Sequence, residues 1–274
     1  MFADLVGFTA LTEAHGDAEA IEIAIRFAER VEDLLADYES EQVKTIGDEV
    51  MIRVDNPVQA VRLGLRIVEE LAHPGSPPVR VGMHSGAAVG RNGDWFGGTV
   101  NLASRVAGAA RAGEVLLTAD TRREVGEPDG VELEEAGARH FRHIPDPVIV
   151  YRAVGAQGAG HHLEIDPVCR MAVDPRTAAG GRRRRGLNYY FCSSDCQRAF
   201  EAQPRRYIAS SPAARAARKG FLINLSAFVV FATIHFLVWA LAPQHPRGSS
   251  GMLALYAAWA IALIIHYRTV HRVF

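Results

Sequence analysis

Residues 41–54 read EQVKTIGDEVMIRV. Two runs of strand-forming residues, 42–46 and 50–54, lie on either side of a Gly-Asp turn. This pattern is typical of a β-hairpin, because β-branched residues favour the pleated strand and Gly-Asp favours a tight reversal. The hairpin would place Asp48 at a strand end.

Helical and strand patterns alternate on both sides of this hairpin. Apolar residues recur with helical spacing over 9–37, 57–72 and 99–110. The runs 79–89 and 114–118 predict further strands. The sequence therefore predicts an α+β fold, a sandwich of ferredoxin type.

Six polar residues within the first 105 positions share chemistry suited to a nucleoside triphosphate. Carboxylates at strand ends can hold hard divalent cations through oxygen. Taken alone, an Asp in a Gly-Asp turn is usually turn chemistry, and an Asn and an Arg four apart on a helix are usually a solvated face. The joint pattern favours a site instead; its members are Asp4, Lys44, Asp48, Asp94, Asn101 and Arg105.

Four segments carry a resemblance to a known family: FADLVGFT, VKTIGDEVM, VRVGMHSG and DWFGGTVNLASR. In this order and spacing, they make residues 1–154 resemble a class III nucleotidyl cyclase catalytic domain. The resemblance implies a homodimer that acts on ATP or GTP with two Mg²⁺ or Mn²⁺ ions.

The resemblance also assigns roles to residues. Metal binding is implied for Asp4, Asp48 and the Leu5 backbone, and base reading for Lys44 and Asp94. Asn101 would orient the ribose, and Arg105 would stabilise the pentavalent phosphorus. Further substrate contacts are implied for Phe8, Thr9 and Arg142, where Arg142 stands in place of the commoner Lys.

Base choice follows from hydrogen-bond polarity. Adenine offers a donor at N6 and an acceptor at N1, which suit Asp94 and Lys44, whereas the guanylyl members carry Glu and Cys. Lys44 is informative because the chain has 28 Arg and only two Lys. The substrate predicted is ATP. Because only three residues precede Asp4, the expectation is that either the true start lies upstream or the first strand is truncated and holds Asp4 poorly.

The second half of the chain differs in charge. Residues 1–154 carry 15 basic and 26 acidic side chains, and residues 155–274 carry 15 basic and 5 acidic ones. A linker of small residues is expected over 155–162. The two halves are expected to meet different surroundings.

All three cysteines follow this linker, in DPVCRM and YYFCSSDC. These motifs resemble the YHS module, associated with heavy metals, and predict a domain over 163–210 in which Arg170 replaces the usual Gly. An odd number of cysteines argues for thiolate ligation rather than a disulfide framework. Cu(I) or Zn is predicted at Cys169, Cys192 and Cys196; buried, unligated thiols are the alternative.

Uncharged stretches near the C-terminus predict a two-helix transmembrane module over 220–274, after a basic segment at 211–219. The spans expected are 221–242 and 251–267, and a buried soluble hairpin is the alternative. A small-residue face of Ala254, Ala258 and Ala262 would hold the second spans of two chains together. Positive charges flank the pair, which predicts contact with lipid in a bacterial inner membrane, with the cyclase domain and both termini in the cytoplasm.

The sequence thus predicts a membrane-anchored adenylate cyclase with no nucleic-acid partner, and the cysteine-containing domain suggests regulation by a metal. The alternative is a membrane metal-sensing adaptor whose cyclase-like domain binds nucleotide with weak or no turnover.

Overall fold

The computed structural model describes residues 1–155, 163–184, 187–209, 212–241, 259–265 and 267. The chain divides into two compact units. The first unit comprises residues 1–182 and 189–197, and the second comprises residues 183–188 and 198–274. The linker predicted over 155–162 lies almost wholly outside the described residues.

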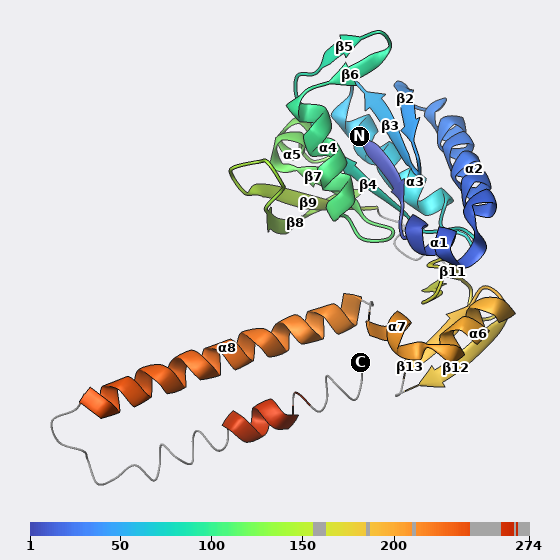
Figure 1. Cartoon of the computed structure of the whole chain (residues 1–274). Coiled ribbons are helices and arrows are strands. Elements are labelled where there is room, and N and C mark those ends of the chain that lie inside the picture. The colour runs from blue at the N-terminus through green and yellow to red at the C-terminus, as the bar shows by residue number, and fades with distance from the viewer. Residues whose placement is uncertain (156–162, 185–186, 210–211, 242–258, 266, 268–274) are drawn as a thin grey trace. The chain divides into compact units, whose positions relative to one another are not determined.

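The first unit is built on a seven-stranded mixed sheet (Figure 1). The strand order is β2-β3-β1-β4-β7-β9-β8, and β4 and β7 are parallel whereas the other pairs for which a register is given are antiparallel. This confirms the predicted α+β class. The strands are β1 (Phe2–Leu5), β2 (Ser40–Ile46), β3 (Glu49–Val54), β4 (Val79–Met83), β7 (Val115–Thr118), β8 (Val131–Arg139) and β9 (Val148–Gly155).

Helices cover both faces of the sheet. A Cβ on Gly64 of α3 would touch the side chains of Val81 and Met83 on β4, whereas a Cβ on Gly82 would lie 1.9 Å from the backbone nitrogen of Ala107 in α4. Since successive side chains of a strand point to opposite faces, α3 and α4 lie on opposite faces of β4. The helices of this region are α1 (Phe8–His15), α2 (Asp17–Leu35), α3 (Pro57–Glu70), α4 (Gly98–Ala109) and α5 (Ala119–Val125).

Two predicted elements are divided in the structure. The helical pattern over 9–37 is interrupted at Gly16, whose φ of 86° ends α1 and leaves His15 at the helix terminus. The strand predicted over 79–89 ends at Met83. Beyond it, β5 (Val89–Arg91) and β6 (Asp94–Phe96) form a separate hairpin, because Asn92 and Gly93 both have positive φ and make a tight turn.

The short first strand is well held. β1 is hydrogen-bonded to β3 on one edge and to β4 on the other, and Phe2 and Ala3 are buried. The expectation that Asp4 would be poorly held is therefore wrong: four residues suffice because both edges of β1 are paired.

The cysteine-containing part of the first unit consists of short elements. β10 (Glu164–Ile165) pairs with β11 (Ala172–Val173), and β12 (Gly180–Arg184) pairs with β13 (Leu187–Phe191). Helix α6 (Ser194–Ala202) follows. The Ala172 N–H donates to the Ser76 carbonyl and the Gly75 N–H donates to the Ala172 carbonyl, both at 2.9 Å. These bonds join the cysteine-containing segment to the loop before β4.

The second unit contains α7 (Pro204–Ala209) and the long helix α8 (Pro212–Leu241). Trp259 packs edge-on against Phe228 and donates its indole N–H to Asn224 at 3.3 Å. The two uncharged stretches therefore contact each other, as predicted for a helical pair.

The prediction of two membrane-spanning helices is not supported. Within the described residues, no helix combines the length and the apolar character needed to cross a bilayer. Residues 242–258, with Ala254 and Ala258, and most of 211–219 lie outside the described positions or side chains. The lipid contact and membrane location that rested on these spans lose their support.

Candidate active site and metal cluster

Three charged side chains form a row across the middle of the sheet. Asp4 on β1 lies in register with Glu49 on β3 and with Arg80 on β4. Asp4 is only 8% exposed, and Arg80 Nε donates to its Oδ2 at 2.7 Å. Arg80 Nη1 also donates to the Gly108 carbonyl of α4 at 2.9 Å. The row is therefore on the α4 face, and Arg80 fixes the carboxylate of Asp4.

Asp48 lies in the β2–β3 turn, close to this row. The Leu5 N–H donates to the Asp48 carbonyl at 3.2 Å, which joins the turn to the end of β1. Burial, and then the charge of Asp4, raise the pKa of Asp48. The same two causes raise the pKa of Glu49 to about 7, and Ser104 of α4 donates to Glu49 at 3.3 Å.

This cluster fits divalent cations. Three carboxylates gather with a single guanidinium, so negative charge is in excess, and burial together with the charge of Asp4 makes Asp48 and Glu49 bind protons more readily than usual. A hard cation with oxygen ligands would relieve that excess. Asp4 and Asp48 are the residues that would hold it, as the sequence suggested.

The structure brings Lys44 and Asp94 together. Lys44 Nζ on β2 lies 2.6 Å from Asp94 Oδ2 on β6. This hydrogen bond lowers the pKa of Asp94, whose Oδ1 accepts the Trp95 N–H at 2.7 Å. Lys44 also lies over the Phe96 ring, 5.6 Å from its centroid. Both charged side chains are partly exposed, so a donor and an acceptor stand side by side at the surface.

The remaining predicted residues lie on α4, on α1 and in one loop. Asn101 and Arg105 are one helical turn apart on α4, on the same side of the helix. Phe8 and Thr9 form the first turn of α1, after Gly7 with its φ of 87°. Arg142 is exposed in the turn between β8 and β9.

One hollow of about 550 Å³ lies beside α4 in the described part of the chain. Thr99, Val100 and Ala103 line it, and none of the six predicted polar residues does. The six residues are therefore not gathered around this hollow.

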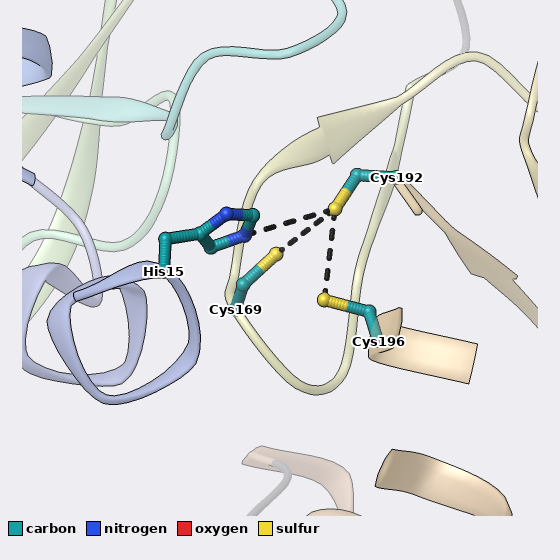
Figure 2. Close-up of side chains that lie close together, drawn as sticks. All are labelled: His15, Cys169, Cys192 and Cys196. Carbon is teal, nitrogen blue, oxygen red and sulfur yellow. Dashed lines mark hydrogen bonds between the residues drawn. The ribbon is translucent and has the colours of Figure 1, made fainter. Parts of the chain in front are cut away.

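The three cysteines form a cluster together with a histidine that sequence reasoning did not identify (Figure 2). The cysteines are free thiols. Ligand atoms of His15, Cys169, Cys192 and Cys196 all lie within 4.8 Å of one another. Hydrogen bonds from Cys169 and Cys192 lower the pKa of Cys196. A sulfur-rich group of this kind is suited to a soft or borderline metal ion.

Arg80 and Glu49 were also absent from the predicted site. A weak signal for them existed, because each is a charged residue in a strand whose other residues are mostly apolar. No comparable signal existed for His15, because the cysteines lie more than 150 positions away along the chain.

Comparisons with known proteins identify two families along the chain. The adenylate and guanylate cyclase catalytic domain family matches residues 1–151. This is more than half of the chain, and the chain belongs to that family. The YHS domain family matches residues 165–210.

Curated relatives cover the same region. The chain is 42% identical over 155 residues to a pH-sensitive adenylate cyclase of Mycobacterium tuberculosis. The match covers 55% of this chain and 39% of the relative. The chain is also 43% identical over 117 residues to an adenylate cyclase of Streptomyces coelicolor. This match covers 42% of the chain and 31% of the relative. The chain thus spans well under half the length of these relatives.

A solved structure shows the same fold. A Trypanosoma brucei adenylate cyclase, described in its monomeric state, superposes with a TM-score of 0.53 at 24% identity. The match covers 58% of this chain and 89% of that one. This likeness supports the cyclase-type architecture of the first unit.

Proposed function

We propose that this chain is an adenylate cyclase that converts ATP to 3′,5′-cyclic AMP and pyrophosphate. The observation that carries the proposal is the Lys44–Asp94 pair, with its 2.6 Å contact. The ammonium can donate to N1 of adenine, and the carboxylate can accept from the N6 amino group. Guanine presents the opposite polarity at these positions, so the pair favours ATP over GTP.

Asp4 and Asp48, with the Leu5 backbone, are the proposed ligands of two Mg²⁺ or Mn²⁺ ions. When bound there, the ions would lower the pKa of the attacking ribose 3′-hydroxyl and neutralise charge on the phosphates. Arg80 supports the proposal, because its bonds to Asp4 and to the Gly108 carbonyl hold one ligand in place without a metal.

The helices supply the other groups. Asn101 is proposed to orient the ribose and Arg105 to stabilise the charge on the pentavalent phosphorus. The first turn of α1, with Phe8 and Thr9, offers free backbone N–H groups to phosphate oxygens. Arg142 would add a cation at the triphosphate.

We further propose that a second copy of the chain completes the site. Ile46 and Phe96, each within two residues of a proposed site residue, are 49% and 50% exposed. An apolar groove of about 450 Å³ lined by Phe8, Ile21 and Ile25 adjoins the β2–β3 turn. Exposed apolar side chains around a polar site are suited to burial against another protein surface. The resemblance to the class III family supports a second copy of the chain at this surface.

The alternative function is a metal-sensing adaptor with a weak or inactive cyclase-like domain. It rested on the expectation that a short first strand would hold Asp4 poorly. Because β1 is paired on both edges and Asp4 is fixed by Arg80, that argument loses its basis. Turnover is the better-supported function.

The test is formation of cyclic AMP from ATP with Mn²⁺ by the full chain. Asp48→Asn should reduce the rate at least about 100-fold, because it removes a metal ligand, while the unfolding temperature stays close to that of the parent. Asp55→Asn is the matched control, since Asp55 is an exposed carboxylate paired with Arg53. Equal rates for the parent and Asp48→Asn would refute the assignment.

A further inference from the structure

The spacing of the cysteine sulfurs matches a tetrahedral metal site. Cys192 Sγ lies 3.4 Å from Cys169 Sγ and 3.7 Å from Cys196 Sγ. A disulfide bond would require about 2.05 Å. Four ligands around zinc, with Zn–S bonds of about 2.3 Å, place neighbouring sulfurs about 3.8 Å apart. The two observed distances are close to that edge length.

His15 faces this group with its Nε2 atom, which lies 4.0 Å from Cys192 Sγ (Figure 2). The corresponding edge in a zinc site with imidazole is about 3.6 Å. His15 Nδ1 lies 3.2 Å from the carboxylate of Glu19, one turn further along in α2. A carboxylate on one ring nitrogen fixes the tautomer that leaves the other nitrogen as a lone-pair donor, an arrangement common for metal-bound histidines.

The backbone around the cysteines is held in place independently of any ion. The buried carboxylate of Asp166 accepts the N–H groups of Val168 and Cys192, each at 2.8 Å. Ser193 accepts the Cys196 N–H at 3.2 Å, which caps α6. Two cysteine loops and a helix start are thus positioned by backbone hydrogen bonds that do not involve the cysteine sulfurs.

The cysteine-containing segment also contacts the loop before α1. Arg170 has a φ of 71° and lies against Gly7, where an added Cβ would come within 2.6 Å of Arg170 Cγ. Position 170 is the one at which this chain departs from the usual Gly of the motif. The segment therefore reaches both ends of α1: Gly7 at its start, through Arg170, and His15 at its end, through the sulfur cluster.

We propose that His15 completes a Cys₃His site with Cys169, Cys192 and Cys196, that the site binds Zn²⁺, and that it clamps the cysteine-containing segment to α1 of the cyclase domain. Four protein ligands leave no open coordination position, as in structural zinc sites. The mixed sulfur and imidazole set favours Zn²⁺ over Cu(I). The inference goes beyond catalysis, because it concerns a second metal and a histidine that is not among the proposed catalytic residues.

The test compares metal binding by the full-length parent and by His15→Ala, which retains all three sulfurs. The parent should bind one Zn²⁺ per chain, measured by competition with a chromophoric chelator. Loss of the imidazole should weaken the affinity at least about tenfold. With Co²⁺ as the spectroscopic probe, the visible absorption bands should shift in His15→Ala, because water replaces nitrogen in the coordination shell.

The matched control is His140→Ala, which removes an exposed histidine at the end of β8. Its affinity and Co²⁺ spectrum should equal those of the parent. Glu19→Gln should show a smaller loss of affinity than His15→Ala. Identical Zn²⁺ affinity and Co²⁺ spectra for the parent and His15→Ala would overturn the proposal, as would binding of Cu(I) without measurable Zn²⁺ binding. None of these readouts depends on cyclic AMP formation, so their failure would leave the proposed activity standing.

Discussion

Lys44 and Asp94 neutralise each other in the structure, 2.6 Å apart. An adenine that enters between them must satisfy the ammonium with N1 and the carboxylate with the N6 amino group. Binding therefore exchanges one charge-assisted contact for two, and a base of opposite polarity would leave both groups unpaired.

Exchanging the hydrogen-bond donor and acceptor at positions 44 and 94 should change which nucleotide the enzyme prefers. In Lys44→Glu combined with Asp94→Cys, the activity with ATP should fall at least about 100-fold, and the ratio of GTP to ATP activity should rise by more than that factor. The measurement is kcat/KM for both nucleotides with Mn²⁺. A double variant that still prefers ATP would show that these side chains do not read the base.

Arg105 should act on the transition state rather than on ATP binding. It lies one turn after Asn101 on α4, and its proposed role is to meet charge that develops on the pentavalent phosphorus. Arg105→Ala should lower kcat about 100-fold with less than about a threefold change in KM. Arg111→Ala, which removes an exposed arginine just beyond α4, is the control. A rise in KM at unchanged kcat would contradict this role.

At the scale of elements, the position of α4 depends on Gly82. The helix approaches β4 so closely that a Cβ at this position would meet the backbone of Ala107 at 1.9 Å. Backbone atoms cannot rotate away as a side chain can, so α4 must shift. Because α4 carries Asn101, Arg105 and Ser104, such a shift would disturb the site as well as the core.

Gly82→Ala should therefore destabilise the protein by about 3 kcal/mol or more, measured by urea unfolding. Gly108→Ala is the matched control: this residue lies in α4 with open space around its Cβ position. There the change should stabilise the protein by up to about 1 kcal/mol, because Ala is the better helix former. Similar effects of the two substitutions would show that close packing does not set the position of α4.

The sequence predicted those elements whose pattern is local. The 41–54 hairpin and α4 are confirmed, because strand periodicity and helix periodicity are each visible within a few residues. The break between α1 and α2 at Gly16 was not predicted, because the helical spacing of apolar residues continues across it. A single glycine with positive φ leaves no mark on that spacing. Sequence reasoning also did not recognise Arg80 or His15, because their partners Asp4 and Cys192 are distant along the chain and meet them only in the folded protein.

At the scale of the whole molecule, the first unit contains two proposed metal centres of different chemistry. Oxygen ligands at Asp4 and Asp48 suit hard Mg²⁺ or Mn²⁺, and sulfur ligands around Cys192 suit Zn²⁺. Helix α1 joins them: it begins three residues after Leu5 and ends at His15. An ion that fixes the end of α1 would therefore also restrict the position of the segment proposed to hold the catalytic metals.

Zinc should raise cyclase activity through this helix. A ligand shifts an equilibrium only when it binds the two states with different affinity, and Zn²⁺ meets that condition if the four ligands converge only when α1 is docked. We expect at least about fivefold higher activity with Zn²⁺ than after its removal by a selective chelator, a coupling within the usual range. The measurement is cyclic AMP formation at saturating Mn²⁺ and ATP, as free Zn²⁺ is varied.

The response should depend on the ligands and not on zinc in general. Cys192→Ser with Cys196→Ser, and separately His15→Ala, should abolish the zinc response while the activity with Mn²⁺ alone stays within about twofold of that of zinc-free parent protein. Zinc that competes for the catalytic site would lower activity equally in the parent and in these variants, so only the difference between their curves reports on the cysteine site. His140→Ala should retain the response. If the parent and the ligand variants gave the same zinc titration curve, the cysteine-containing segment would be a passive attachment, and the coupling through α1 would be refuted.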